Sequence, residues 1–122
     1  KKSLSQIIET FPQYISSPEI KIGCPDELKV GLMAEINQRL GQDFPRAEII
    51  NDERVGDGTR VEFKDKMFVI RYSQNAPYLT IKFEAKTTED YNSLKGYINK
   101  LLHQYKEVEW SSRLNVNIGS LL

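Results

Sequence analysis

Alternating apolar and polar residues mark three consecutive stretches in the middle of the chain as β-strands. Residues 59–63 carry valine and phenylalanine at alternate positions, residues 67–71 are almost continuously apolar, and residues 78–85 alternate throughout. A period of two places the apolar side chains on one face of a sheet. The connections are short, so we expect antiparallel pairing, with a hairpin around Asp65 and Lys66.

Two other stretches show the period of an α-helix. The first covers residues 25–41, with Pro25 in its first turn and Gly41 as the expected C-cap. The second begins at Thr87, which together with Asp90 forms a start similar to a capping box. Apolar residues on one face predict that both helices pack on a core. These are Leu28, Leu32, Ile36 and Leu40 in the first helix and Tyr91, Leu94, Ile98, Leu101, Leu102 and Tyr105 in the second.

The order of these elements predicts an α+β fold of two layers, an antiparallel four-stranded sheet with two helices on one face. A strand around residues 20–22 precedes the first helix, and residues 47–50 are a short candidate strand. A length of 122 residues fits one domain. We expect residues 1–17 to form a lead-in or linker helix, residues 18–106 the domain, and residues 107–122 a C-terminal tail. Apolar and polar residues alternate briefly in the tail. We interpret it as either an added strand or a segment that docks elsewhere.

The charge balance limits the partners that the chain can attract. Seventeen Lys and Arg residues balance 17 Asp and Glu residues, so the formal net charge is zero. Without a broad positive field we expect neither a nucleic-acid nor a membrane partner, and an anion site must be a local pocket. No apolar run reaches the roughly 18 residues of a membrane helix.

The only cysteine is Cys24, which excludes an internal disulfide bond and favours a reducing compartment such as the cytoplasm. At its place between a predicted strand and a predicted helix, we interpret it as a small buried group. The chain starts with KKSLSQ, without an initiator methionine or the apolar region of a signal peptide. We therefore expect it to be a piece of a longer chain.

The segment RYSQNAPYL, residues 71–79, connects two predicted strands and contains the chemical groups of a phosphate-binding loop. Arg71 presents a planar fork of donors, and Ser73 adds a hydroxyl group. The backbone N–H groups of residues 73–75 can converge in a tight loop. Pro77 fixes φ where the chain enters the next strand. On spacing alone, a polar hairpin with a solvated arginine remains the alternative.

Three other features have simpler interpretations. Residues 56–58, Gly-Asp-Gly, are expected to form a turn, because Asp57 is their sole carboxylate and Mg²⁺ needs several oxygen ligands. His103 has no second histidine or cysteine near it in the sequence, so we interpret it as a solvated helix residue. Trp110 lies in the tail, where it either packs on this domain or docks on a neighbouring one.

The run from Gly56 to Leu94 resembles the C-terminal domain of the α-D-phosphohexomutases, the phosphoglucomutase/phosphomannomutase family. The resemblance covers about residues 3–105 and is most specific at the loop RxSxxxP, which is followed at once by a strand ending in Glu84 and Ala85. It implies a fold like that of the TATA-binding protein. It also implies that the loop binds the non-transferring phosphate of a phosphosugar, such as a glucose or mannose phosphate.

The loop departs from the family pattern at three consecutive positions. The family commonly has Gly or Asn at position 74, Thr at position 75 and Glu before the proline. This chain has Gln74, Asn75 and Ala76 at these positions. The longer side chain at position 74 is expected to alter the width of the loop. The roles that the resemblance implies are main phosphate ligand for Arg71, hydroxyl donor for Ser73, loop donors for Gln74 and Asn75, and shaping of the turn for Pro77.

The resemblance also implies which parts of an enzyme are missing from this chain. The family interconverts hexose 1-phosphate and hexose 6-phosphate through a bisphosphorylated intermediate, using a phosphoserine and an Asp-rich loop that binds Mg²⁺. Neither motif is visible here. We therefore expect no catalytic residue and no metal ligand in this chain, Mg²⁺ bound elsewhere in the parent enzyme, and the remaining parent domains as partners. The alternative is a non-catalytic phosphate-binding or protein-interaction module with the same fold.

Overall fold

A computed structural model describes residues 14–52 and 57–122 of the chain. Most of the predicted lead-in helix therefore lies outside the described residues. The last part of that range, near Ile15, forms a short strand that pairs with the sheet.

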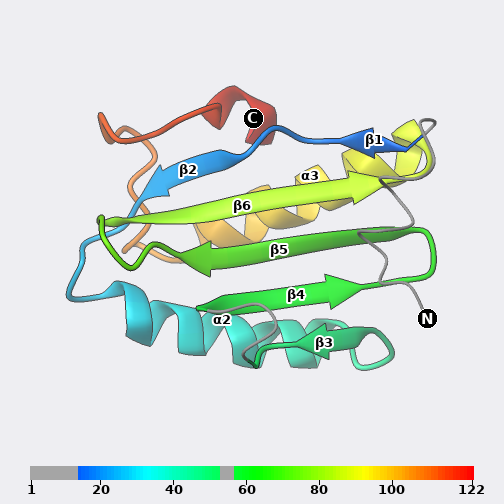
Figure 1. Cartoon of the computed structure of the whole chain (residues 1–122), viewed down its shortest axis with the longest axis horizontal. Coiled ribbons are helices and arrows are strands. Elements are labelled where there is room, and N and C mark those ends of the chain that lie inside the picture. Colours follow the sequence, from blue (N-terminus) through cyan, green and yellow to red (C-terminus); the bar gives the residue numbers. More distant parts are fainter. Residues whose placement is uncertain (1–13, 53–56) are drawn as a thin grey trace.

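An antiparallel sheet of six strands forms one layer of the domain (Figure 1). Its order is β1-β6-β5-β4-β3, and β2 also pairs with β6, so β1 and β2 follow each other along the same edge of β6. Every strand pair is antiparallel. The strands are β1 (Ile15–Ser16), β2 (Ile20–Gly23), β3 (Glu48–Ile50), β4 (Gly58–Glu62), β5 (Lys66–Tyr72) and β6 (Tyr78–Ala85).

The prediction of a four-stranded sheet is wrong, because two short strands extend the four predicted ones. Strand β1 has two residues and β3 has three, and such lengths are too short to show a period of two in the sequence. The candidate strand at residues 47–50 does form, as β3. A fold like that of the TATA-binding protein, with four strands, is not confirmed.

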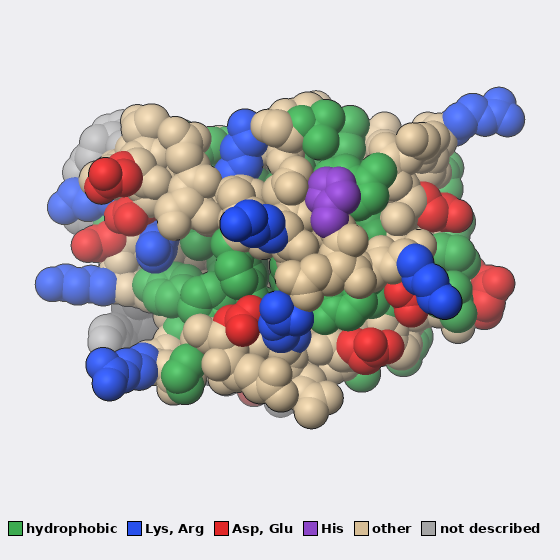
Figure 2. All heavy atoms as spheres, turned by 180° about the vertical axis from the view of Figure 1, so that it is seen from behind, with side chains coloured by type: hydrophobic (Ala, Val, Ile, Leu, Met, Phe, Trp, Pro, Cys, Tyr) green, Lys and Arg blue, Asp and Glu red, His purple; other side chains and the backbone are tan. Residues whose placement is uncertain are grey.

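Two helices cover one face of the sheet, which confirms the α+β class. Helix α2 (Lys29–Asp43) packs on β4 and β5, and α3 (Thr88–His103) packs on β5 and β6. Helix α3 begins as predicted, with the Asp90 N–H donating to Thr87 Oγ1 at 3.0 Å. Figure 2 shows this face, with hydrophobic and charged side chains interspersed. No helix among the described residues is long and apolar enough to span a membrane.

One hydrophobic core joins both helices to the sheet. Strand residues alternate, so that Ile70 and Ile81, which are partners in the register, face the core while Arg71 and Thr80 beside them face outward. The largest fully buried side chains are Phe68, Phe83, Ile20, Ile22, Leu32, Ile36, Leu40, Ile70, Leu79, Ile81, Ile98 and Leu101.

Helix α2 differs from the prediction at both ends. It begins at Lys29, after a turn in which the Pro25 carbonyl accepts from the N–H of Lys29 at 3.1 Å. It also continues past Gly41, which is therefore not the C-cap. The last turn is held by Asp43, which forms an ion pair with Arg39 at 3.1 Å and accepts a hydrogen bond from α3. This local ion pair and the tertiary hydrogen bond outweigh the preference of glycine for a helix end.

The C-terminal tail packs on this domain through β2. The N–H of Val116 donates to the Lys21 carbonyl at 2.9 Å, and the Lys21 N–H donates back at 3.0 Å. The Glu109 N–H donates to the Gly23 carbonyl at 2.8 Å. The outer edge of β2 is thus paired instead of exposed, which protects it from pairing with another chain.

Side chains of the tail also contact helix α3. Trp110 stacks on His103 with ring centroids 3.9 Å apart, and Leu121, in the 3₁₀-helix η1 (Ile118–Leu121), is buried in the core. Of the two alternatives for Trp110, the structure therefore shows packing on this domain. His103 is exposed and its Nδ1 lies 2.8 Å from the Asn99 carbonyl.

Gly58 provides a test of the close approach between β4 and β5. A Cβ atom at Gly58 would lie 2.2 Å from the Ile70 carbonyl oxygen, whereas one at Gly96 in α3 would meet nothing within 4 Å. We expect Gly58→Ala to lower the free energy of unfolding by about 1–3 kcal/mol. Gly96→Ala, the matched control, should raise it by about 0.4–1 kcal/mol. Urea denaturation measures both, and equal effects would contradict the close approach.

Candidate anion-binding site

A polar pocket of about 310 Å³ lies on the sheet face opposite the helices, at the loop between β5 and β6. Its walls come from β2, β5, β6 and the segment before β4, which the sheet order brings together. All four predicted phosphate ligands line it. The lining residues are Glu19, Lys21, Asp57, Arg71, Tyr72, Ser73, Gln74, Asn75, Tyr78 and Thr80.

Arg71 is an exposed cation that has no partner among the described residues. Its register partners are Thr80 on β6 and Gly58 on β4, so no large side chain stands directly beside it. The guanidinium group makes no hydrogen bond or ion pair with any residue in the described ranges. Its fork of donors is therefore free to bind an anion from solvent.

The loop itself engages two of the three amides that were expected to converge. The Ser73 N–H donates to the Tyr78 carbonyl at 3.0 Å, and the Asn75 N–H donates to Ser73 Oγ at 3.2 Å. The Gln74 N–H has no acceptor within the part of the chain that the structure describes. Because Ser73 Oγ accepts from Asn75, its own hydrogen remains available for a ligand.

Pro77 occupies the centre of a three-residue turn that leads into β6. The Tyr78 N–H donates to the Ala76 carbonyl at 2.9 Å, across a residue whose ring fixes φ near the value that this turn needs. The Pro77 carbonyl accepts from the Cys24 N–H at 2.9 Å. The Cys24 side chain is fully buried, and burial, followed by the charge of Glu107, raises the pKa of its thiol to about 11.

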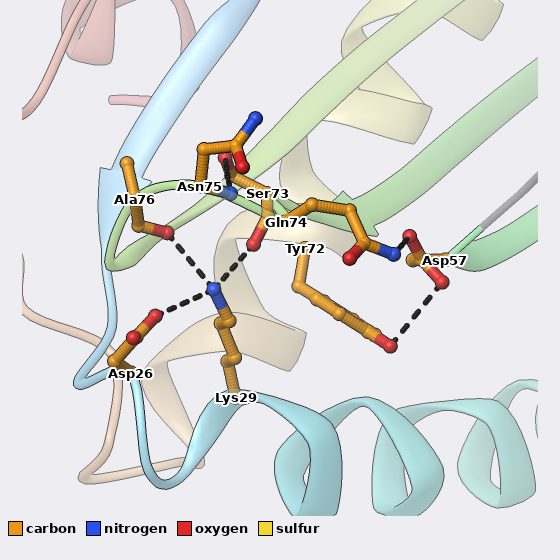
Figure 3. Close-up of polar contacts among 8 residues, drawn as sticks. All are labelled: Asp26, Lys29, Asp57, Tyr72, Ser73, Gln74, Asn75 and Ala76. Carbon is orange, nitrogen blue, oxygen red and sulfur yellow. Dashed lines mark hydrogen bonds and ion pairs between the residues drawn. The ribbon is translucent and has the colours of Figure 1, made fainter.

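Lys29 holds the loop from the side of helix α2 and is the main residue that the sequence did not reveal (Figure 3). Its Nζ donates to the Ser73 carbonyl and, at 3.2 Å, to the Ala76 carbonyl. The ammonium group also pairs with Asp26 at 2.5 Å and lies 5.7 Å from the centre of the Tyr72 ring. Lys29 is only 5% exposed, and it needs such partners because burying an unpaired ammonium group costs free energy.

The burial of Lys29 corrects the predicted stripe of α2 at one position. Leu28 is 43% exposed, and Lys29 is buried beside Leu32 instead. The first turn of the helix thus faces the loop with a cation in place of an apolar side chain.

Asp57 anchors the opposite side of the loop (Figure 3). Its Oδ1 accepts from the Tyr72 hydroxyl at 3.3 Å, and its Oδ2 accepts from the Gln74 side-chain amide. Partial burial, followed by the Asp57 carboxylate, raises the pKa of the Tyr72 phenol, which therefore stays a donor at neutral pH. The long side chain of Gln74 is thus held by Asp57.

A metal ion has no suitable ligand set in this part of the molecule. No group of three or more His, Cys, Asp and Glu side chains among the described residues is placed to hold one. Both carboxylate oxygens of Asp57 accept hydrogen bonds, one from Tyr72 and one from Gln74, and so hold the loop.

The fold and the pocket together define an α+β domain with a candidate anion site on its sheet. A comparison with established protein families gives no match. The chain is 31% identical over 104 residues to a probable phosphoglucosamine mutase of Methanothermobacter thermautotrophicus, which covers 81% of this chain and 22% of that protein. It is 27% identical to a phosphoglucomutase of Neisseria meningitidis, over 87% of this chain and 22% of that protein.

Two further comparisons agree with these. A phosphomannomutase/phosphoglucomutase of Pseudomonas syringae is 29% identical over 74% of this chain and 18% of its own length. A crystal structure of a phosphoglucomutase/phosphomannomutase family protein from Burkholderia thailandensis shares the fold, with a TM-score of 0.54, 23% identity, and coverage of 82% of this chain and 19% of that one.

The chain is therefore related to the phosphoglucomutase/phosphomannomutase family over most of its length, as the resemblance predicted. It spans about a fifth of the length of the curated relatives that it matches.

Substitution of Lys29 tests its role in the loop. We expect Lys29→Met to lower the free energy of unfolding by about 1–3 kcal/mol, because the carbonyls of Ser73 and Ala76 lose their donor. Hydrogen exchange of the Ser73 amide should also become faster. Lys100→Met, at an exposed position of α3, is the control. Unchanged exchange at Ser73 in the Lys29 variant would show that the loop holds its shape without Lys29.

The raised pKa of Cys24 predicts a dependence of stability on pH. The thiol has a pKa of about 11 in the folded chain against an ordinary 9.0, so the unfolded state loses its proton first as pH rises. The free energy of unfolding should therefore fall between about pH 9 and pH 11. Urea titrations of the wild type and of Cys24→Ala isolate this component, which the variant lacks. Parallel pH profiles of the two proteins would contradict the raised pKa.

Proposed function

We propose that this chain is the phosphate-binding C-terminal domain of a phosphohexomutase that interconverts hexose 1-phosphate and hexose 6-phosphate through a bisphosphorylated intermediate. The names of its relatives, phosphoglucosamine mutase, phosphoglucomutase and phosphomannomutase, support this reaction class. Since the chain spans about a fifth of each, the remaining domains of the parent chain would carry the phosphoryl transfer.

The observation that carries the proposal is the guanidinium group of Arg71, which has no partner among the described residues and lies beside loop donors that also have none there. An arginine fork matches two oxygens of a phosphate and forms two charge-assisted hydrogen bonds. The Gln74 N–H and the Ser73 hydroxyl line the same pocket and have a hydrogen to donate. A phosphate bound there would meet one donor group at the end of β5 and two more in the loop that follows it.

The remaining loop residues support this binding mode. The Asn75 side-chain amide lines the pocket and has no partner among the residues that the structure describes, so it can donate to a phosphate oxygen. Pro77 and Lys29 fix the loop before the ligand arrives, which lowers the entropy lost on binding.

Mg²⁺ would serve the parent enzyme from outside this chain. It would neutralise charge on the phosphoryl group during transfer. This domain would instead hold the phosphate that is not transferred and close over the substrate, a glucose or mannose phosphate, to exclude water.

Titration of the chain with a hexose bisphosphate tests the proposal. We expect amide chemical shifts of residues 73–75 to move, and Arg71→Ala to weaken binding at least about tenfold, since a charge-assisted hydrogen bond contributes about 1.5–3 kcal/mol. Arg46→Ala removes an arginine that is exposed and outside the pocket, and should bind like the wild type. In the parent enzyme, Arg71→Ala should raise KM strongly.

Silence of the loop amides at millimolar bisphosphate, together with an unchanged KM in the parent variant, would overturn the proposal. A protein-interaction module with the same fold would then be the better interpretation.

A further inference from the structure

A second cation, Lys21, lines the same pocket as Arg71. In the register of the sheet both residues are partners of Thr80, Lys21 from β2 and Arg71 from β5. The three side chains therefore form one row on the outer face of the sheet. Neighbouring strands are about 4.8 Å apart, so the Cα atoms of the two cations are about 10 Å apart. Both side chains are long enough to reach one ligand above the small Thr80.

The ammonium group of Lys21 has no carboxylate partner among the described residues. Instead it lies over the ring of Tyr78, 5.1 Å from Nζ to the ring centre. The buried Lys29, in contrast, is paired with Asp26 and two carbonyls. Lys21 is half-buried, so part of its hydration is already lost and an anion would restore a favourable partner.

The backbone of Lys21 is held on both sides. Its strand pairs with β6, and the residue itself exchanges two backbone hydrogen bonds with Val116 of the tail, at 2.9 and 3.0 Å. The lysine therefore belongs to a rigid wall of the pocket and does not need to be ordered by the ligand.

Two carboxylates also line the pocket and affect its charge. Asp57 is engaged by the Tyr72 hydroxyl and the Gln74 amide on the side of β4. Glu19 precedes β2 and is exposed to solvent. Neither carboxylate forms an ion pair with Lys21 or Arg71.

We propose that Lys21 is the second cation of the anion site and that the pair Lys21–Arg71 makes it selective for a dianionic phosphate monoester over a singly charged anion of the same shape. The proposal rests on the proposed function, because both use the same pocket. It adds a ligand from β2, outside the loop that carries the other donors, and it defines the charge state of the group that binds.

Methyl phosphate and methyl sulfate provide a matched pair of probes. At pH 8 methyl phosphate is dianionic, because the second pKa of a phosphate monoester is about 6, whereas methyl sulfate carries a single charge. Amide shifts of the ¹⁵N-labelled chain give both dissociation constants at low salt. We expect the wild type to bind methyl phosphate at least about fivefold more tightly than methyl sulfate, as an added ionic contact permits. Lowering the pH to 5 should abolish this preference.

Variants at position 21 test whether Lys21 causes the preference for methyl phosphate. Lys21→Gln should reduce it to about twofold or less, and Lys21→Arg should retain it. Lys82→Gln is the matched control, since Lys82 is exposed two residues beyond Thr80 on the same strand and outside the pocket. It should leave the preference unchanged.

The outcomes separate this inference from the proposed function. If Arg71→Ala abolishes binding while Lys21→Gln binds both probes as tightly as the wild type, Lys21 is not a ligand and the proposed function stands. If Lys21→Gln weakens both probes equally, the selectivity is overturned. If the wild type binds neither probe nor the bisphosphate, and Arg71→Ala leaves the KM of the parent enzyme unchanged, both proposals are wrong.

Discussion

The pairing of β5 with β6 is the constraint on which the rest of the structure depends. It joins seven residue pairs, and it places Ile70 and Ile81 in the core while Arg71 and Thr80 face the pocket. A shift of one residue would send the isoleucines to solvent and the arginine into the apolar core. The same register therefore secures both the packing under the helices and the cation on the opposite face.

The helices influence the pocket although they cover the other face of the sheet. Lys29 extends from the first turn of α2 to two loop carbonyls, and Asp57 holds the loop from the β4 side. The loop is thus fixed at two points before any ligand is present. Its shape is a property of the whole domain, because neither anchor belongs to the loop segment.

The sequence predicted the parts of the fold that have long, regular patterns. Strands β2, β4, β5 and β6 and both helices follow from their periods, β3 was predicted only as a short candidate strand, and β1, with two residues, is too short to show a period. Within the pocket, Arg71 and its loop could be found because they are contiguous. Lys29 could not, since its partner Ser73 is 44 residues away, and a lysine among apolar residues usually indicates a solvated position. Asp57 was interpreted only as part of a turn, and its contact with the loop could not be predicted for the same reason, since Gln74 lies 17 residues away.

The tail along β2 has a consequence for how force and insertions act on the molecule. The strand that carries Lys21 is bordered by β6 on one side and by the backbone of Val116 on the other. A pull on the C-terminus would therefore act first on Leu121, which is buried in the core, and then, along the tail, on one wall of the pocket. Residues inserted between α3 and η1 would act on the same wall. Changes in the hairpin between β4 and β5 would not, because that hairpin lies at the end of β5 opposite the pocket.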